Sequence, residues 1–248
     1  MNIFPLSPSR INAFDCHFYF FKHYIEGVKE DEALLPVMLH NGRFQHKVIE
    51  IYNKELVKNK LNSDLETLEN ITNKEWLTGK YHLPESSYEG IRTDLIKFAE
   101  TYHLESEFFY GNELQIAIGK DKIPCPYDNG NDIWLRGILD KVEINLDQGL
   151  AVITDFKTGF YIPAESEVRE SWQTLIYPFL LKNLFSINPT FGEIENFQMV
   201  YHYTKWNIKQ TFNFAKDEID SVEDKIRRIS DRIEKKANDR DTEWNPIR

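Results

Sequence analysis

Residues 151–157 read Ala-Val-Ile-Thr-Asp-Phe-Lys, and this stretch decides the fold that the chain is expected to adopt. The run is apolar and rich in β-branched residues, which predicts a strand. Because side chains alternate between the two faces of a strand, Asp155 and Lys157 share one face. Strand geometry places them about 7 Å apart on that face.

A second predicted strand comes just before and carries another carboxylate. Residues 133–145 include Asp140, which shares a face with Ile138, where an unpaired carboxylate would be costly. The link at 145–149 is Asn-Leu-Asp-Gln-Gly, a composition typical of a turn. A hairpin there brings Asp140 close to Asp155, and adjacent carboxylates repel unless a proton or cation lies between them. A divalent metal is therefore expected, and the alternative for each acid alone is a solvated or lysine-paired carboxylate.

Asp140 followed by Asp155-Phe156-Lys157 resembles the signature of the PD-(D/E)XK nuclease superfamily. The flanking residues 136–142 and 153–159 resemble the RecB-type exonuclease branch of that superfamily, to which CRISPR-associated exonucleases are related. The resemblance implies an α/β fold with a restriction-endonuclease-like core, in which helices flank a central mixed β-sheet and a helical insert precedes it.

Three outlying elements also resemble that branch, and they occur in the order expected for it. Residues 42–46 fit its Gly-x-x-x-His element, which implies that His46 is a metal ligand. Gln173 and Tyr177 fit its Gln-x-x-x-Tyr element, which implies contacts to the nucleic-acid strand near the scissile phosphate. Residues 6–20 resemble its opening helix. From the residues alone, a histidine at the position of His46 is more often a core residue than a ligand, and the in-order companion elements reverse that preference. Tyr177 can also pack in an amphipathic helix while it serves the site.

Taken together, the resemblance implies metal-dependent hydrolysis of phosphodiester bonds. The ligands of one or two Mg²⁺ or Mn²⁺ ions would be His46, Asp140, Asp155 and the backbone carbonyl of Phe156. The metal would lower the pKa of bound water and stabilise charge on the phosphate. Lys157 would position the attacking water or neutralise that charge. Glu113, on the preceding predicted strand, is either a supporting acid behind the ligands or an ordinary strand carboxylate.

The two cysteines separate this chain from some members of the branch. Those members hold an iron–sulfur cluster with one cysteine near the N-terminal helix and three near the C-terminus. Cys16 occupies about the first position, but Cys125 lies far upstream of the other three. Two thiols cannot supply four cysteine ligands, so no iron–sulfur cluster is expected.

Composition predicts a globular protein with one domain. The chain has 248 residues, of which 41% are hydrophobic and 14% aromatic, enough for a sizeable core. One nuclease domain is expected over 1–248, with a helical part to about 105, a catalytic core at about 106–215 that includes the helix at 38–58, and a C-terminal helix at 216–237. No apolar run reaches the ~20 residues of a membrane span, and the first residues lack signal-peptide features. A cytoplasmic protein without membrane contacts is therefore expected.

The net charge of −10 weighs against a nucleic-acid partner, because phosphate contacts usually require basic surfaces. Whether DNA binds depends on the electrostatic field at the binding cleft rather than on the net charge. A bound metal ion inverts the potential of a carboxylate site. Basic residues near the motifs are Lys22, Arg43, Arg136, Lys141, Lys157, Arg169 and Lys205. The alternative is that these residues are ordinary solvent-exposed surface residues. Weak, salt-sensitive binding of DNA is expected, with help from a protein partner.

Periodicity and turn signals predict the elements along the chain. Ser7 is the expected N-cap of the first helix. Pro178 is expected to kink or break the helix at 167–184. Helices are predicted at 7–24, 38–58, 64–77, 88–104, 167–184 and 216–236. Strands are predicted at 108–118, 133–145, 151–156, 196–204 and 207–214.

Three functions remain open at this point. The first is a stand-alone RecB-like DNA exonuclease in recombination, repair or phage DNA processing. The second is the nuclease subunit of a larger assembly, such as a CRISPR adaptation or helicase–nuclease complex. The third is a nucleic-acid-binding module of the same fold without hydrolysis, which is disfavoured because Asp140, Asp155 and Lys157 are all present.

Overall fold

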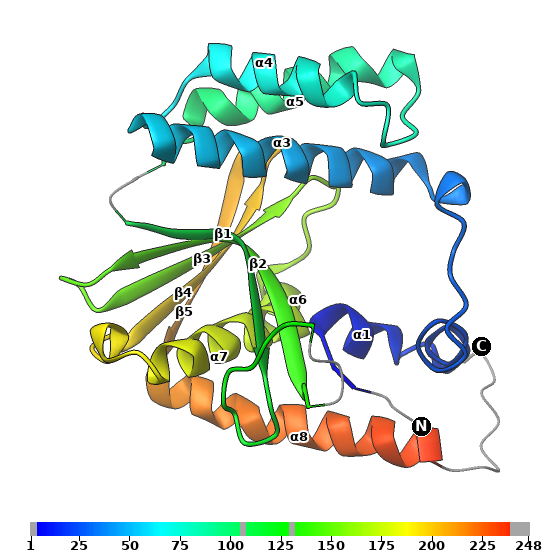
Figure 1. The fold of residues 1–248 in the computed structure, drawn as a ribbon, viewed down its shortest axis with the longest axis vertical. Helices are drawn as coiled ribbons and strands as arrows, with labels where there is room; N and C mark the ends of the chain where they lie inside the picture. Colours follow the sequence, from blue (N-terminus) through cyan, green and yellow to red (C-terminus); the bar gives the residue numbers. More distant parts are fainter. Residues whose placement is uncertain (1–3, 105–107, 129–131, 239–248) are drawn as a thin grey trace.

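The computed structural model describes residues 4–104, 108–128 and 132–238, and its centre is a five-stranded mixed sheet (Figure 1). The strand order is β1-β2-β3-β4-β5, with β3 and β4 parallel and the other neighbours antiparallel. The strands are Phe109–Ile118 (β1), Leu135–Asn145 (β2), Leu150–Lys157 (β3), Asn196–Tyr203 (β4) and Ile208–Ala215 (β5). The predicted mixed sheet is confirmed, with strand ends within two residues of those expected.

The hairpin of β2 and β3 folds back where the turn composition predicted. Oδ1 of Asn145 accepts a hydrogen bond of 3.0 Å from the backbone N–H of Gln148. Gly149 has φ of +56°, a left-handed conformation that glycine adopts without a Cβ penalty. The register pairs Lys141 with Thr154, so Asp140 and Asp155 occupy the next positions along the two strands.

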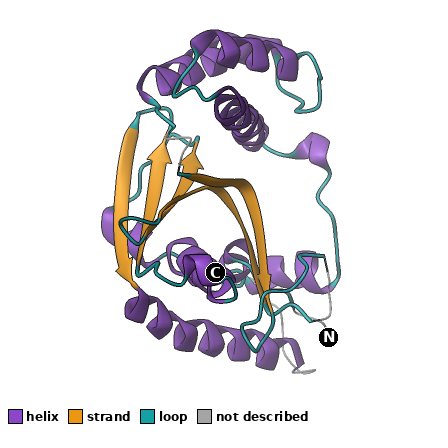
Figure 2. Cartoon of the chain, turned by 60° about the vertical axis from the view of Figure 1, so that its left-hand side comes forward, coloured by secondary structure: helices purple, strands orange, loops and turns teal. Residues whose placement is uncertain are grey.

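Helices cover both faces of the sheet in two separate layers (Figure 2). The first layer is α7 and α8, with α1 beside them, and it encloses the larger hydrophobic core. The second layer is α3, α4 and α5, and it encloses a smaller core that includes Phe44, Phe98 and Phe156. The helices are α1 (Pro8–Ala13), α2 (His17–Phe20), α3 (Val37–Asn59), α4 (Leu65–Trp76), α5 (Tyr88–Thr101), α6 (Glu165–Glu170), α7 (Trp172–Ser186) and α8 (Lys216–Asn238).

Alternation along β3 divides its side chains between the two cores, as the sequence pattern predicted. Ala151 and Ile153 belong to the larger core, whereas Phe156 belongs to the smaller one. On α8 the predicted apolar stripe faces the core, because Ile219, Ile226 and Ile233 are all fully buried. Asp155 therefore starts from the α7 face of the sheet, near the end of β3.

Parallel strands need a crossover, and here α6 and α7 supply it between β3 and β4. The single helix predicted at 167–184 is wrong in one respect, because Ser171 interrupts it with an extended backbone (φ −65°, ψ 146°). The Ser171 hydroxyl then accepts a hydrogen bond from the N–H of Thr174 and caps α7. Gln173 and Tyr177 consequently lie in the first two turns of α7.

Pro178 is expected to kink or break this helix, and a break does not occur, because α7 runs through this residue to Ser186. A proline inside a helix removes one hydrogen bond and costs about 3 kcal/mol. Pro178 is buried, and so are its neighbours Tyr177 and Phe179, so tertiary packing offsets that cost.

The single helix predicted at 7–24 is also wrong. It is divided into α1, α2 and a π-helical turn η1 (Phe21–Ile25), although the predicted Ser7 cap accepts from the N–H of Arg10. Phe14 and Phe20 are buried together, with ring centroids 5.4 Å apart. Six residues apart on a straight helix, these side chains would point about 120° away from each other. Breaking the helix lets both rings enter one core.

Three short 3₁₀ turns complete the described elements, at Glu32–Leu34 (η2), Glu85–Ser87 (η3) and Pro189–Phe191 (η4). Within the described ranges, none of the helices combines the length and the apolar composition that crossing a membrane requires.

Candidate active site

Asp140 and Asp155 meet at the centre of the molecule, where β2 and β3 lie side by side. The side chain of Asp155 is 4% exposed and that of Asp140 is 13% exposed. Burial raises the pKa of Asp140 well above its usual range, and the neighbouring Asp155 carboxylate raises it further. The backbone N–H of Phe156 opposes this by donating a hydrogen bond of 2.7 Å to Oδ2 of Asp140. The predicted approach of two carboxylates is therefore present.

His46 approaches the same carboxylate from α3, on the other side of the sheet. Its Nδ1 lies 3.4 Å from Oδ2 of Asp140. Burial lowers the pKa of His46, which favours the neutral imidazole that metal ions bind. Hydrogen bonding to the Phe156 backbone acts in the opposite direction. Since such a bond raises a histidine pKa only when the ring donates, it points to the carbonyl of Phe156, the backbone ligand that the resemblance implied.

Glu113 completes a group of three possible ligands. One donor atom each from His46, Glu113 and Asp140 lie within 4.8 Å of one another. Glu113 sits on β1 between the pairs Asn112–Lys141 and Leu114–Leu139, which places it opposite Asp140. Its carboxyl has a raised pKa, because of burial first and the charge of Glu50 second. Glu113, predicted as a possible supporting acid, thus lies close enough to His46 and Asp140 to share a metal ion with them.

The backbone at Glu113 is strained in a way that aims its side chain. Its φ of +49° is in the left-handed region, which is rare for a residue other than glycine. Such a conformation costs on the order of 1–3 kcal/mol and is found mainly at functional sites. Four other described non-glycine residues, Lys60, His82, Lys122 and Asn207, also have positive φ outside the cluster, so this conformation alone does not mark a site.

Asp155 is held by a different set of partners, on the α7 side. Its Oδ1 accepts a hydrogen bond of 2.5 Å from Nε2 of Gln173, whose Oε1 accepts one of 2.8 Å from Nζ of Lys157. Nζ of Lys157 is also 2.7 Å from Oδ2 of Asp155. That contact has the distance of an ion pair but not the angles of a hydrogen bond, so this buried oxygen accepts no well-directed bond. It remains available to a cation.

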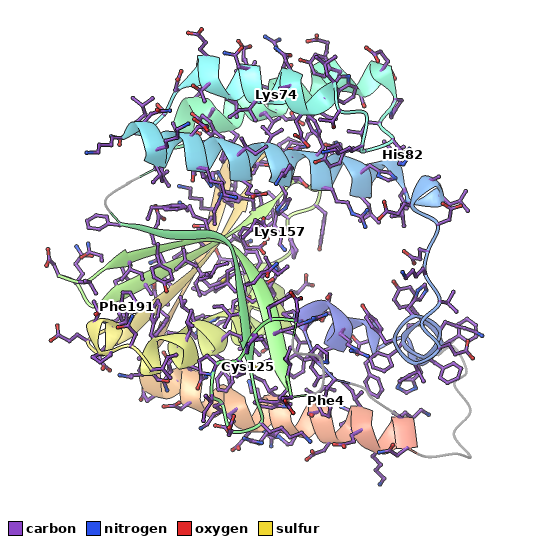
Figure 3. All side chains as sticks on the ribbon, in the orientation of Figure 1. Phe4, Lys74, His82, Cys125, Lys157 and Phe191 are labelled. Atoms are coloured by element: carbon purple, nitrogen blue, oxygen red, sulfur yellow. The ribbon has the colours of Figure 1, made fainter. Side chains whose placement is uncertain are left out.

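Tyr177 extends this network toward the surface. Nε2 of Gln173 lies 3.0 Å from the Tyr177 hydroxyl oxygen, which accepts its hydrogen bond. Burial, and then the charge of Asp155, raise the pKa of Tyr177, so its hydroxyl stays protonated and can donate. Figure 3 shows Lys157 near the middle of the molecule, below α3, where these groups converge.

Two glycines permit the close approaches on which the site depends. A Cβ at Gly137 would lie 2.9 Å from Cδ1 of Leu180 and 3.0 Å from Cε1 of Tyr177. A Cβ at Gly42 would lie 3.2 Å from Oγ1 of Thr158. Gly137 therefore lets α7 lie against β2, and Gly42 lets α3 approach the loop that follows β3. The glycine of the predicted 42–46 element has this structural role.

A cleft of about 640 Å³ opens onto the cluster from the α3 side. Its lining includes His46, Glu113 and Asp140, together with Arg43 and Lys47. A ligand in this cleft would contact the imidazole of His46 and the carboxyl groups of Glu113 and Asp140 directly. The two cysteines take no part in the site: Cys16 is the exposed residue before α2, and Cys125 lies in the loop between β1 and β2, near α8 (Figure 3).

A mixed sheet that carries paired acids and a lysine on adjacent strands, with a histidine from a covering helix, defines the class of restriction-endonuclease-like nucleases. The comparisons with known proteins agree. The profile of the PD-(D/E)XK nuclease superfamily matches residues 5–246, and the chain belongs to this superfamily. No curated protein matches the chain significantly.

A solved structure is similar over almost the whole chain. It is the crystal structure of a "Putative exonuclease" from Eubacterium rectale, at 11% sequence identity and a TM-score of 0.54. The match covers 98% of this chain and 83% of that one. At this identity the similarity shows the fold, and it confirms the predicted restriction-endonuclease-like core.

Proposed function

We propose that this protein is a metal-dependent deoxyribonuclease that hydrolyses phosphodiester bonds, and that it acts as an exonuclease. The observation that carries the proposal is the convergence of His46, Glu113 and Asp140 beside the ion pair of the buried Asp155 with the partly exposed Lys157. Membership of a nuclease superfamily supports nucleic-acid hydrolysis. The similar fold of the Eubacterium rectale protein, which is named a "Putative exonuclease", supports the exonuclease assignment.

The residues present fit a divalent cation. Carboxylate oxygens with one imidazole suit Mg²⁺, and Mn²⁺ accepts the histidine more readily. A cation would also reduce the electrostatic repulsion among the carboxylates of Glu113, Asp140 and Asp155. His46, Glu113, Asp140 and Asp155 would hold the metal with the carbonyl of Phe156. When bound, the metal acidifies a water molecule and stabilises negative charge on the phosphate.

The remaining groups position the substrate and the nucleophile. Lys157, fixed by Asp155 and Gln173, holds an ammonium group at the end of β3, where it can orient a water molecule or neutralise phosphate charge. Gln173 fixes the mutual orientation of Asp155 and Lys157, and the Tyr177 hydroxyl is left to donate to the strand. Gln173 is therefore a positioning residue in this proposal, and Tyr177 the contact to nucleic acid.

Digestion of end-labelled DNA tests the proposal directly. Linear and circular DNA, each single- and double-stranded, are incubated with Mg²⁺, Mn²⁺ or EDTA. We expect cleavage of linear DNA with either metal, none with EDTA, and losses of at least ~10³-fold in Asp155→Asn and Lys157→Met. Asp231→Asn and Lys225→Met are matched controls, because both residues are exposed on α8. Equal rates in the site variants and controls would refute the hydrolytic function.

A second candidate is a cytoplasmic nuclease subunit of a helicase–nuclease, recombination or CRISPR adaptation assembly. The observation that favours it is a run of exposed apolar side chains at the mouth of the cleft, where Leu34 is 81% and Met38 60% exposed. A partner covering them would remove apolar surface from water. If the isolated chain degrades DNA processively and Leu34→Ser leaves that rate unchanged, this second candidate loses its support.

A further inference from the structure

A second cavity, of about 480 Å³, lies on the Tyr177 side of the candidate site. It is bounded by the start of α1, the η1 turn, residue 127 of the β1–β2 loop, the first residues of β2 and the start of α7. Among the residues that the structure describes, its lining contains two arginines, Arg10 and Arg136, and neither aspartate nor glutamate. In a chain with a net charge of −10, a cavity with this lining is unusual.

Arg10 is fixed in the wall of this cavity. Its Nη1 donates to the carbonyl of Pro5 at 2.9 Å, and its Nη2 donates to that of Tyr24 at 3.1 Å. Its guanidinium lies over the Tyr24 ring, 4.8 Å from the centroid. Its Nε is buried without a hydrogen-bond partner. Within the described ranges no carboxylate forms an ion pair with it, so the charge is held rigidly and uncompensated.

Arg136 presents the second charge from β2. Its guanidinium lies over the Tyr127 ring at 5.0 Å, and in the part of the chain that the structure describes it pairs with no carboxylate. Among the other described arginines, Arg43, Arg92 and Arg227 do pair with glutamates, whereas Arg169, Arg228 and Arg232 resemble Arg136 in lacking such a pair, so what sets Arg10 and Arg136 apart is that they line one cavity together. Burial, and also the charge of Arg136, lower the pKa of Arg10, so the two cations repel each other across the cavity. Like charges kept together in this way call for an anion.

The cavity is connected to the candidate active site by shared residues. Gln173 lines it and also binds Asp155 and Lys157, and Ile138 lines both this cavity and the cleft at the metal cluster. Arginines bind phosphate with two parallel hydrogen bonds, and such contacts set the position of a nucleic-acid strand. The rings of Tyr24 and Tyr127 beside them are suited to stacking against bases.

We propose that Arg10 and Arg136 form a binding site for a phosphate of the substrate strand adjacent to the phosphate that is cleaved. The proposal rests on the nuclease function above and adds the route of the strand, which leaves the metal cluster past Gln173 and Tyr177 toward α1. Arg136 makes the main contact, because the terminal nitrogens of Arg10 already bind two carbonyls. Arg10 supplies the fixed charge behind it.

Methylphosphonate scanning of a labelled DNA oligonucleotide tests this contact. One phosphate at a time is replaced by its uncharged analogue, and kcat and KM are measured with Mn²⁺ for wild type, Arg136→Gln and the control Arg228→Gln, an exposed arginine on α8. We expect one position next to the cleaved bond where the analogue raises the wild-type KM about 10-fold or more. Arg136→Gln should show a similar rise with unmodified DNA and no further rise at that position.

Two further measurements separate binding from folding. In EDTA, Arg136→Gln should bind unmodified DNA more weakly, with the slope of log K against log salt reduced by about 1. Arg136→Lys should recover part of the affinity. Oligonucleotides with a 5′-hydroxyl, a 5′-phosphate or a 3′-phosphate show whether the phosphate bound is internal or terminal, and either result supports the site.

The failures are distinguishable. If Arg136→Gln is as sensitive as wild type to the analogue at every position, while wild type cleaves DNA, the phosphate site is wrong and the nuclease function stands. If Arg228→Gln changes KM as much as Arg136→Gln does, the effect is one of net charge and the site is again wrong. If wild type cleaves no DNA with any metal, the nuclease function fails and this inference falls with it.

Discussion

Gln173 and Asp155 are joined by a hydrogen bond of 2.5 Å from Nε2 to Oδ1. The same amide accepts from Nζ of Lys157 through its Oε1, at 2.8 Å. One side chain on α7 therefore sets the orientation of an acid and a lysine that both belong to β3. The family resemblance implied that the glutamine contacts the nucleic acid, whereas these contacts predict that its first effect is on the two side chains beside it.

Replacing Gln173 distinguishes these two roles. Gln173→Leu removes the hydrogen bonds to Asp155, Lys157 and Tyr177 with little change in volume. We expect kcat to fall about 10²–10³-fold with KM nearly unchanged, because Lys157 is no longer fixed near the reacting phosphate. Steady-state kinetics on a short DNA oligonucleotide measures both constants. Gln198→Leu, which removes an exposed cross-strand bond to Asn213, is the matched control. If KM rises while kcat is unchanged, Gln173 acts instead as a contact to the nucleic-acid strand.

The carboxylate cluster predicts opposite effects of Asp140→Asn on stability and on metal response. Asn keeps the shape of Asp140 and removes one of three neighbouring negative charges, so we expect the unfolding free energy in EDTA to rise by about 1–2 kcal/mol. Mn²⁺ at ~100 times its Kd should stabilise wild type by about 2.7 kcal/mol and the variant much less.

Thermal unfolding with and without Mn²⁺ measures both effects. Asp231→Asn, an exposed acid on α8, serves as the control and should respond to Mn²⁺ as wild type does. If Asp140→Asn gains as much from Mn²⁺ as wild type, Asp140 does not bind the metal.

The sheet and most helices were predictable because their patterns are local. Alternation over 151–157 and the Asn-to-Gly turn before it fix the β2–β3 hairpin, and the register follows from them. The breaks at Phe14–Cys16 and Ser171 were not predictable, since they depend on what the flanking residues pack against. At Pro178 a local rule predicts a kink or a break, and the helix nevertheless continues through this residue because α7 is buried in the core.

The site was predictable to the extent that β2 and β3 position it. Asp140, Asp155 and Lys157 lie on one hairpin, whose turn could be recognised. Glu113 comes from β1, and the sequence between β1 and β2 is too long to fix a register between the two strands. No sequence pattern indicated its left-handed φ or its place opposite Asp140. Arg10 was missed because its significance lies in the absence of an acid nearby, which only the fold shows.

Glu223, away from the candidate site, is expected to make a small pH-dependent contribution to the stability of the folded protein. Hydrogen bonds lower its pKa, chiefly that from Lys122 in the β1–β2 loop, at 2.9 Å. The unfolded chain then takes up the proton at a higher pH than the native chain does. The stabilisation is therefore complete above the ordinary glutamate pKa and is lost as the pH falls through the lowered native pKa. Because the side chain is 20% exposed, we expect less than about 1 kcal/mol.

Urea unfolding of wild type and Glu223→Gln measures this term. The variant should be less stable at about pH 7, and the difference should disappear as the pH falls below the lowered native pKa of Glu223, where its side chain is neutral like that of glutamine. Asp224→Asn is the control, because this neighbouring residue is exposed. A difference between wild type and Glu223→Gln that persists at low pH would show that packing, not charge, is responsible.

Gly137 gives the sharpest test of how the fold holds the site. In Gly137→Ala the new methyl group meets Leu180 at 2.9 Å and the Tyr177 ring at 3.0 Å, closer than real Cβ contacts. Both neighbours are buried in the core, so α7 must move away from β2, at a cost of about 1–3 kcal/mol. The shift displaces Tyr177 and Gln173 together, and we expect kcat/KM to fall more than 10-fold, since small displacements of positioned groups are costly.

Gly90→Ala is the matched control, because Gly90 lies in α5 with no atom within 4 Å of the added methyl group. Alanine should stabilise that helix by about 0.5–1 kcal/mol and leave kcat/KM unchanged. Urea unfolding and oligonucleotide cleavage are measured on both variants. If Gly137→Ala loses stability but cleaves DNA at the wild-type rate, the contact between Tyr177 and β2 supports the fold alone, and the positions of Gln173 and Tyr177 do not limit catalysis.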